Sequence, residues 1–124
     1  MPSPRPDCIF CKIIGRAAPA SIVYEDEATL AFLDIRPMTT GHTLVIPKSH
    51  AAYLEELPEG TAGPILETAS KVAAALRRSE LPCEAVNLWR ANGQEAGQVV
   101  FHVHFHVIPR FRGDGFGLRV GPDY

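Results

Sequence analysis

Three histidines alternate with apolar residues in the segment VFHVHFHVIPR, residues 100–110. Successive side chains of a β-strand point to opposite faces, so His102, His104 and His106 are expected to share one face while Val103, Phe105 and Val107 anchor the strand in the core. At about 3.3 Å per residue, neighbouring histidines would lie roughly 6.6 Å apart along the strand. Two neighbouring histidines can converge on one metal ion, but all three cannot do so without distorting the strand. We therefore expect the row to be divided between different roles.

Three interpretations of this row compete: a metal site, a catalytic site, or half-buried strand histidines without chemistry. The last is disfavoured, because burying three adjacent imidazoles is costly unless each finds a partner. A neutral imidazole can attack a phosphorus or carbonyl centre without bringing negative charge to an anionic substrate, and its neighbours can donate hydrogen bonds or protons. Amides near Gly93 and Gly97 offer a weak additional signal for phosphate, although these glycines match no phosphate-loop pattern.

The N-terminal region adds a C-x-x-C pair, Cys8 and Cys11. In a reducing compartment this spacing indicates metal or redox chemistry. Two thiolates from one short turn, completed by two histidines, would form a closed Cys₂His₂ zinc site. The alternatives are a pair of small buried apolar residues and a redox motif, and the redox motif is disfavoured because no βαβ pattern surrounds the cysteines.

Length and charge limit the function classes. The 124 residues suit one domain spanning 1–124, and the net charge of −2 gives no reason to expect a nucleic-acid partner. Prolines in MPSPRPDCIF replace the apolar run of a signal peptide, and no segment approaches the roughly 20 apolar residues that cross a bilayer. We expect a cytoplasmic protein without membrane contact.

The residue patterns predict an α+β fold with about five antiparallel strands. Apolar spacing in CIFCKIIG indicates a short N-terminal helix that ends at Gly15, and a period near four indicates the main helix between Glu59 and Leu81. Alternating or β-branched runs predict the strands, and Pro109 is expected to close the last of them. The expected strands span 22–24, 29–33, 43–47, 84–91 and 99–108.

The residues also resemble a known family. HVHFHVI at 102–108 matches the His-φ-His-φ-His-φ-φ signature of the histidine triad (HIT) nucleotide hydrolases and transferases, where φ is an apolar residue. Companion segments match in the same order along nearly the whole chain, and the cysteine pair resembles the zinc-binding, bacterial-type C-x-x-C branch. These segments are CIFCKIIG, VYEDEATLAFLDIRP, GHTLVIPKSH and NGQEAGQ.

The resemblance implies the histidine triad fold, with a five-stranded antiparallel sheet, one main helix and a short N-terminal helix, usually assembled as a homodimer. It implies hydrolysis of nucleoside phosphoramidates or dinucleoside polyphosphates through a nucleotidyl-histidine intermediate that releases a nucleoside monophosphate. A purine nucleotide substrate is the expectation. The alternative is a zinc-stabilised nucleotide-binding or scaffold protein with incidental hydrolysis, which the nucleophile flanked by proton donors disfavours.

Site residues follow from the same resemblance. His104 would be the nucleophile, with His106 and His42 as further catalytic residues. The implied ligands of a structural zinc are Cys8, Cys11, His50 and His102. The implied substrate contacts are Asp34 for ribose, Gln98 and Asn92 near the leaving group, and Ile9, Phe10, Ile13, Phe32 and Ile35 for the base. Val99 and Ala91 depart from the polar residues common in the family, which leaves open the choice between phosphoramidase and polyphosphate hydrolase.

Overall fold

The computed structural model describes residues 5–117 and 121–123. They form one antiparallel five-stranded sheet, one long helix and a short N-terminal helix, so the predicted α+β architecture is confirmed. The elements are α1 (Ile9–Ile14), β1 (Ile22–Glu25), β2 (Thr29–Leu33), β3 (Thr43–Pro47), η1 (Leu54–Glu56), α2 (Ala62–Arg78), β4 (Ala85–Trp89), η2 (Gln94–Ala96) and β5 (Phe105–Arg110).

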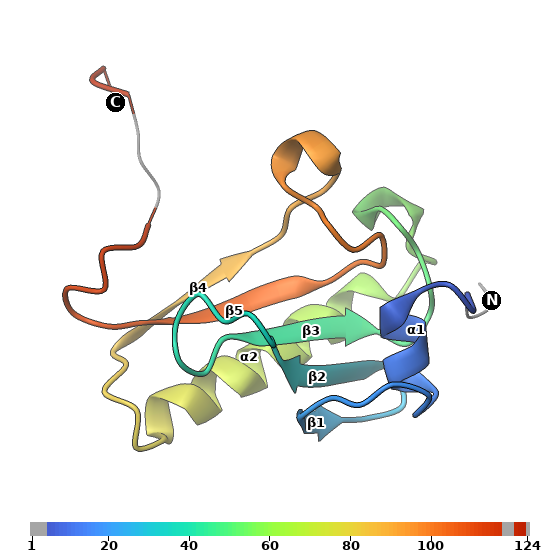
Figure 1. Ribbon diagram of the computed structural model, residues 1–124, viewed down its shortest axis with the longest axis horizontal. Helices are drawn as coiled ribbons and strands as arrows, with labels where there is room; N and C mark the ends of the chain where they lie inside the picture. Colours follow the sequence, from blue (N-terminus) through green and yellow to red (C-terminus); the bar gives the residue numbers. More distant parts are fainter. Residues whose placement is uncertain (1–4, 118–120, 124) are drawn as a thin grey trace.

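The strand order β1-β2-β3-β5-β4 places the last strand in the interior of the sheet (Figure 1). β5 pairs with β3 on one side, where His106 lies opposite Leu44, and with β4 on the other, where it lies opposite Trp89. β4 is therefore an edge strand, although it precedes β5 in the chain.

Each face of the sheet carries its own apolar cluster. The main helix α2 covers one face, where Ile65, Ala69 and Val72 pack with Val45 and Val107. On the opposite face, residues of α1 pack with alternate residues of β2 and β3. That second cluster comprises Phe10, Ile13, Leu30, Phe32, Leu44 and Ile46. In the described part of the chain, no helix has the length and apolar character needed to cross a membrane.

The prediction of a strand over 99–108 is wrong for its first half. β5 begins at Phe105, so His106 lies in the strand while His102 and His104 lie in an irregular segment before it. The backbone turns away from strand pairing because the N–H of Val103 donates to the carbonyl of Ala51 at 2.8 Å.

The expectation that Pro109 closes the strand is also wrong. Pro109 lies inside β5 opposite Val86, and the strand continues to Arg110. A proline is tolerated there because the pairing of β5 with β3 ends at Thr43 and Val107, so no ladder hydrogen bond is lost on that side.

Candidate active site and metal centre

The four predicted metal ligands converge from three separate segments. Cys8 caps the N-terminus of α1 and Cys11 lies in its first turn, His50 follows β3, and His102 precedes β5. Their donor atoms all lie within 4.8 Å of one another. The Cys11 sulfur is 3.3 Å from Nδ1 of His50 and 3.6 Å from Nδ1 of His102.

These distances fit a tetrahedral zinc ion. Zinc–nitrogen bonds of about 2.05 Å and zinc–sulfur bonds of about 2.3 Å place sulfur and nitrogen ligands about 3.5 Å apart and two nitrogens about 3.3 Å apart. The Cys8 sulfur lies 3.5 Å from Nδ1 of His102, and the Nδ1 atoms of His50 and His102 are 3.2 Å apart. The set is closed, because four protein donors complete the coordination of zinc.

The protonation of His102 supports the same interpretation. Its Nε2 lies 2.8 Å from the carbonyl oxygen of Pro47, which can only accept, so Nε2 carries the proton. In the neutral ring Nδ1 then has a free lone pair, and this lone pair faces the other three donors. Such a group of lone pairs can bind a single cation.

His104 is fixed in the complementary tautomer. Its Nδ1 lies 2.8 Å from the backbone oxygen of His102, which accepts the Nδ1 proton. The Nε2 lone pair of His104 is therefore available for attack on an electrophile. The ring is buried, and Phe10 packs edge-on against it with 5.2 Å between the ring centroids, which restricts its orientation.

A chain of hydrogen bonds fixes the next pair of histidines. The backbone N–H of Met38 donates to Nδ1 of His42 at 3.1 Å, so a neutral His42 carries its proton on Nε2. That Nε2 lies 2.9 Å from Nδ1 of His106 and donates to it. The proton of His106 is consequently on Nε2, where the ring can donate to a substrate oxygen. The rings of His104 and His106 lie 5.1 Å apart, so a ring with a free lone pair and a ring with a free N–H stand side by side.

Burial keeps these rings neutral. Loss of water, together with repulsion from the neighbouring His104 and His42, lowers the pKa of His106 to about 4. Burial likewise lowers the pKa of His42 and of His104 below the ordinary value, although Asp34 opposes this shift in both. The histidines therefore hold their assigned tautomers at neutral pH.

Asp34 lies next to this chain of histidines. One carboxylate oxygen is 3.7 Å from Nε2 of His42, and the other accepts from the N–H of Arg36 at 2.9 Å. The backbone N–H of Asp34 also donates to the carbonyl of His42 at 3.0 Å. The predicted ribose contact is thus held at the edge of the histidine row.

The five residues predicted to contact the base differ in their solvent exposure. Phe10, Ile13 and Phe32 are buried together, and the rings of Phe10 and Phe32 pack edge to face. Ile9 is half exposed on α1, whereas Ile35 is 90% exposed and lies outside that cluster. Three of the five predicted base contacts are therefore part of the core on the catalytic face.

Gln98 is buried and its side-chain amide is engaged within the protein. Its Nε2 donates to the carbonyls of Ala52 at 2.8 Å and Val100 at 3.0 Å, and its Oε1 accepts from the N–H of Gly93 at 2.7 Å. The side chain closes the 93–98 loop onto the segment that follows His50.

Asn92 makes a second connection between the same two segments. Its Oδ1 accepts from the N–H of Leu54 at 2.8 Å and from Arg90 at 2.7 Å, and its Nδ2 donates to Glu55 at 2.8 Å. The two predicted leaving-group contacts therefore also hold the loop that borders the histidines.

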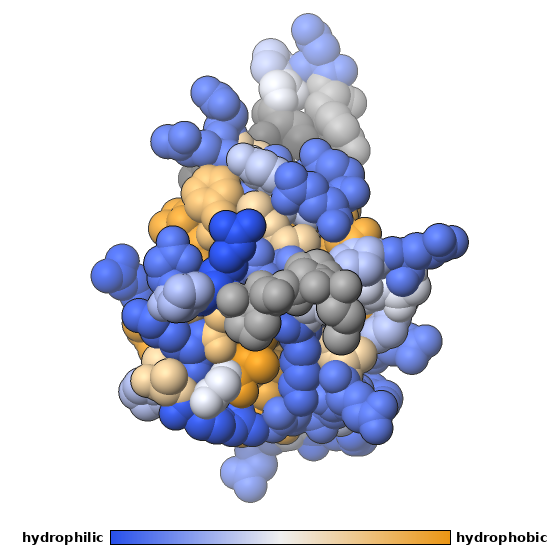
Figure 2. Space-filling view, turned by 90° about the vertical axis from the view of Figure 1, so that its right-hand side faces the viewer, coloured by the Kyte–Doolittle hydropathy of each residue, from blue (hydrophilic) through white to orange (hydrophobic). Residues whose placement is uncertain are grey.

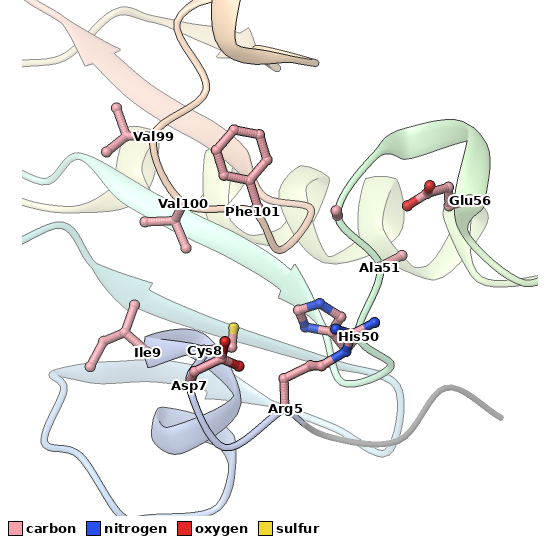
Figure 3. A pocket seen from close by; sticks show the side chains of 11 residues that line it. Arg5, Asp7, Cys8, Ile9, His50, Ala51, Glu56, Val99, Val100 and Phe101 are labelled. Carbon is pink, nitrogen blue, oxygen red and sulfur yellow. The ribbon is translucent and has the colours of Figure 1, made fainter.

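A cavity of about 760 Å³ is lined by Cys8 and His50 of the four-donor cluster, and the row of His42, His104 and His106 lies outside its lining. Figure 3 shows Cys8 and His50 on one side of it, with Val99 and Phe101 across from them. The face that includes α1 is mostly hydrophilic, and apolar side chains appear only in small areas between polar ones (Figure 2).

Trp89 was not predicted as a site residue. Its ring lies 4.9 Å from that of His106 at an interplanar angle of 41°, and the side chain is 41% exposed. The only available signal is the register that pairs β4 with β5, which cannot be read from the order of residues.

Fold and site together define an α+β protein that presents a row of neutral histidines beside a cluster of four donors that could hold a metal ion. The chain belongs to the HIT domain family, whose model matches residues 16–113. The match begins after both cysteines, so the metal centre rests on the geometry given above.

Named relatives include proteins with assigned activities. An uncharacterized HIT-like protein of Borreliella burgdorferi is 50% identical over 116 residues, covering 93% of this chain and 84% of the relative. Adenosine 5'-monophosphoramidase hnt1 of Schizosaccharomyces pombe is 44% identical over 118 residues, covering 94% and 84%. These similarities place the chain with nucleotide hydrolases at the level of the family.

Solved structures of family members have the same fold as this chain, which confirms the predicted histidine triad fold. A zinc-bound histidine triad protein from Mycobacterium smegmatis superposes with a TM-score of 0.86 at 44% identity, covering 94% of this chain and 84% of that chain. A HIT family protein from Bacillus anthracis gives a TM-score of 0.88 at 46% identity, covering 94% and 82%.

Proposed function

We propose that this protein hydrolyses nucleoside phosphoramidates or dinucleoside polyphosphates through a nucleotidyl intermediate on His104. The observation that carries the proposal is the hydrogen bond from Nδ1 of His104 to the backbone oxygen of His102, because it leaves Nε2 as a free nucleophile in a neutral ring. A protein that only binds nucleotides has no need for this arrangement.

The reaction has two steps. The Nε2 lone pair of His104 forms a bond to the α-phosphorus, and the bond from phosphorus to the leaving group breaks with its electrons on the leaving group. The imidazolium that results is stabilised by the carbonyl of His102, while Nε2–H of His106 donates to a non-bridging phosphate oxygen. Water then displaces Nε2 from phosphorus. Overall, the water hydroxyl ends on phosphorus and its proton on the leaving group.

The remaining predicted residues bind the nucleoside in this proposal. Asp34 accepts from the ribose hydroxyls, and the base lies against the apolar residues that α1 and β2 contribute to the catalytic face. A purine offers more apolar surface than a pyrimidine to Ile9, which is the half-exposed residue of this set on α1, and this is the basis for preferring a purine nucleotide.

Zinc bound by the two cysteines, His50 and His102 has a structural role in this proposal. When bound there, the ion would link α1, the segment after β3 and the segment before β5 through their side chains. His102 contributes Nδ1 to this centre and its backbone oxygen to His104, so ligation also holds the carbonyl that orients the nucleophile.

The proposal is tested by incubating the purified protein with adenosine 5'-monophosphoramidate and, separately, with diadenosine triphosphate, and by measuring AMP release. We expect turnover of at least one substrate that is proportional to protein concentration, and the ratio of the two kcat/KM values assigns the subclass. Nucleotide binding without AMP release from either substrate would favour the scaffold alternative.

The lowered pKa values predict a flat pH profile near neutrality. The hydrogen-bond chain needs neutral His42 and His106, and burial holds the pKa of His106 at about 4 and lowers that of His42. The groups nearest His106 are His104, His42, Asp34 and Arg90. Rates should therefore be constant from about pH 8 to about pH 6 and fall only in more acidic solution, where the rings gain protons. A half-maximal kcat/KM near pH 6.5 or above would contradict this assignment.

We also propose that the protein is a homodimer formed through β4. This strand lies at the end of the sheet and has one unpaired side, and Leu88 on it is 50% exposed. An edge strand with apolar side chains tends to pair with another chain. Sedimentation equilibrium should give twice the mass of one chain, and Leu88→Asp should shift the protein toward the monomer. A wild-type protein that is monomeric at about 100 µM would refute this interface, since stable dimers persist well below that concentration.

A further inference from the structure

A groove extends along β4 and β5 beside the histidine row, and Trp89 in its lining contacts His106. It has a volume of about 420 Å³. Side chains of β4 and β5 form its floor, and the segment after β5 contributes its outer wall. The lining residues are Met38, Asn87, Leu88, Trp89, Ile108, Arg110, Phe116 and Gly117. Leu88 also belongs to the strand edge proposed above for the dimer, so the groove borders that interface.

Trp89 connects this groove to the catalytic histidines. Part of its ring covers His106, with 4.9 Å between the ring centroids. The far edge of the indole reaches the 93–97 loop, because a Cβ placed on Gly97 would lie 3.9 Å from the outer carbon of the ring. The side chain is still 41% exposed, so ring surface remains available to a ligand.

Strand order determines which part of a substrate would meet this groove. Asp34 follows β2, His42 precedes β3, His106 lies on β5 and Trp89 on β4, and these strands are consecutive in the sheet. With the nucleoside at the β2 side and phosphorus at His104 and His106, the group on the other side of phosphorus extends over β4. The groove therefore lies where the leaving group would be.

The lining favours a planar, uncharged group. Met38, Trp89 and Phe116 present apolar or aromatic surface. The one cation in the lining is already neutralised, because the Arg110 guanidinium donates to both carboxylate oxygens of Asp114 and lies 4.8 Å above the ring of Phe116. Such a groove stacks an aromatic ring and offers no free positive charge to a phosphate.

We propose that this groove is a leaving-group subsite for a planar aromatic moiety, such as the second nucleobase of a dinucleoside polyphosphate, with Trp89 as the stacking surface. The inference rests on the proposed hydrolase function and deepens it. It assigns the protein a preference for substrates in which an aromatic ring lies beyond the cleaved bond.

The kinetic test compares two substrates that differ in the leaving group. Diadenosine triphosphate has a second base, whereas adenosine 5'-monophosphoramidate releases ammonia. Base stacking on an aromatic side chain is worth about one to two powers of ten in binding, so Trp89→Ala should lower the ratio of the two kcat/KM values about tenfold. Trp89→Phe should lower it less. The ratio cancels any general effect of Trp89 on His106, on which both substrates depend.

Leu66→Ala is the matched control, because Leu66 is an exposed apolar residue of α2 on the opposite face, and it should leave the ratio at the wild-type value. An unchanged ratio in Trp89→Ala would overturn the proposal. Trp89 is the chain's single tryptophan, so binding can also be followed without turnover. In the His104→Ala protein, diadenosine triphosphate should quench the fluorescence and AMP should not. Equal quenching by the two nucleotides would overturn the subsite, and this result does not depend on turnover. A wild-type protein that hydrolysed neither substrate would instead defeat the proposed function.

Discussion

Replacing His104 with alanine is expected to lower AMP release by at least about a thousandfold, with little change in nucleotide affinity. The loss is large because the nucleophile itself is removed, and no other histidine is oriented to replace it. His106 carries its proton on Nε2 and serves as a donor, while His102 directs its lone pair to the metal centre. Steady-state kinetics with the better of the two substrates gives the value.

A second substitution separates loss of the nucleophile from loss of structure. His104→Gly leaves a space in which free imidazole can bind, and added imidazole should restore part of the activity. Both variants should retain the wild-type zinc content, since His104 contributes no donor atom to that centre. Comparable rates in wild type and His104→Ala would show that His104 is not the nucleophile.

Loss of the metal is expected to have the largest effect on stability. Removing zinc, or replacing Cys11 with serine, separates α1 from the segments that carry His50 and His102, and it leaves buried donor atoms facing one another. Metal binding energy is folding energy in such sites, and we expect a loss of roughly 3–5 kcal/mol in the free energy of unfolding. For a chain of this size the loss corresponds to a Tm about 10–20 °C lower, which calorimetry with and without chelator can measure.

Cys83 provides the matched control for that substitution. It is buried like Cys11, but its thiol donates to the carbonyl oxygen of Ala85 and contributes nothing to the four-donor cluster. Cys83→Ser should retain one zinc per chain, whereas Cys11→Ser should bind little. A wild-type protein that contains no zinc after anaerobic purification, with the same Tm in chelator, would contradict the structural role.

Sequence patterns that extend over only a few residues predicted most of the fold. The short apolar runs at 29–33 and 43–47 and the four-residue period of α2 reflect which faces are buried, and burial is imposed locally on each element. The segment before β5 was mispredicted because its conformation is decided by residues remote in sequence. The carbonyls of Ala51 and Pro47 accept from Val103 and His102, and no local pattern reports those contacts.

The candidate site likewise has features that local sequence patterns predict and features that only the folded chain determines. The alternating histidines and the C-x-x-C spacing identified three of the four donors that converge, because those residue types are required by their chemistry, whereas His50 was predicted only from the resemblance to the family. The tautomers of His42 and His106 depend on one backbone N–H, that of Met38, which only the folded chain brings into place. The contact between Trp89 and His106 depends likewise on the register of β4 against β5.

The central claim is a covalent nucleotidyl intermediate on His104, and the most direct measurement is mass spectrometry of the protein quenched during turnover. We predict that a peptide containing residues 100–110 gains the mass of one AMP moiety, that fragmentation places it on His104, and that the adduct disappears when substrate is exhausted. The His104→Ala protein should show no adduct. A nucleotide attached to another residue, or active wild-type protein in which rapid quenching at substrate saturation traps no adduct, would contradict the account.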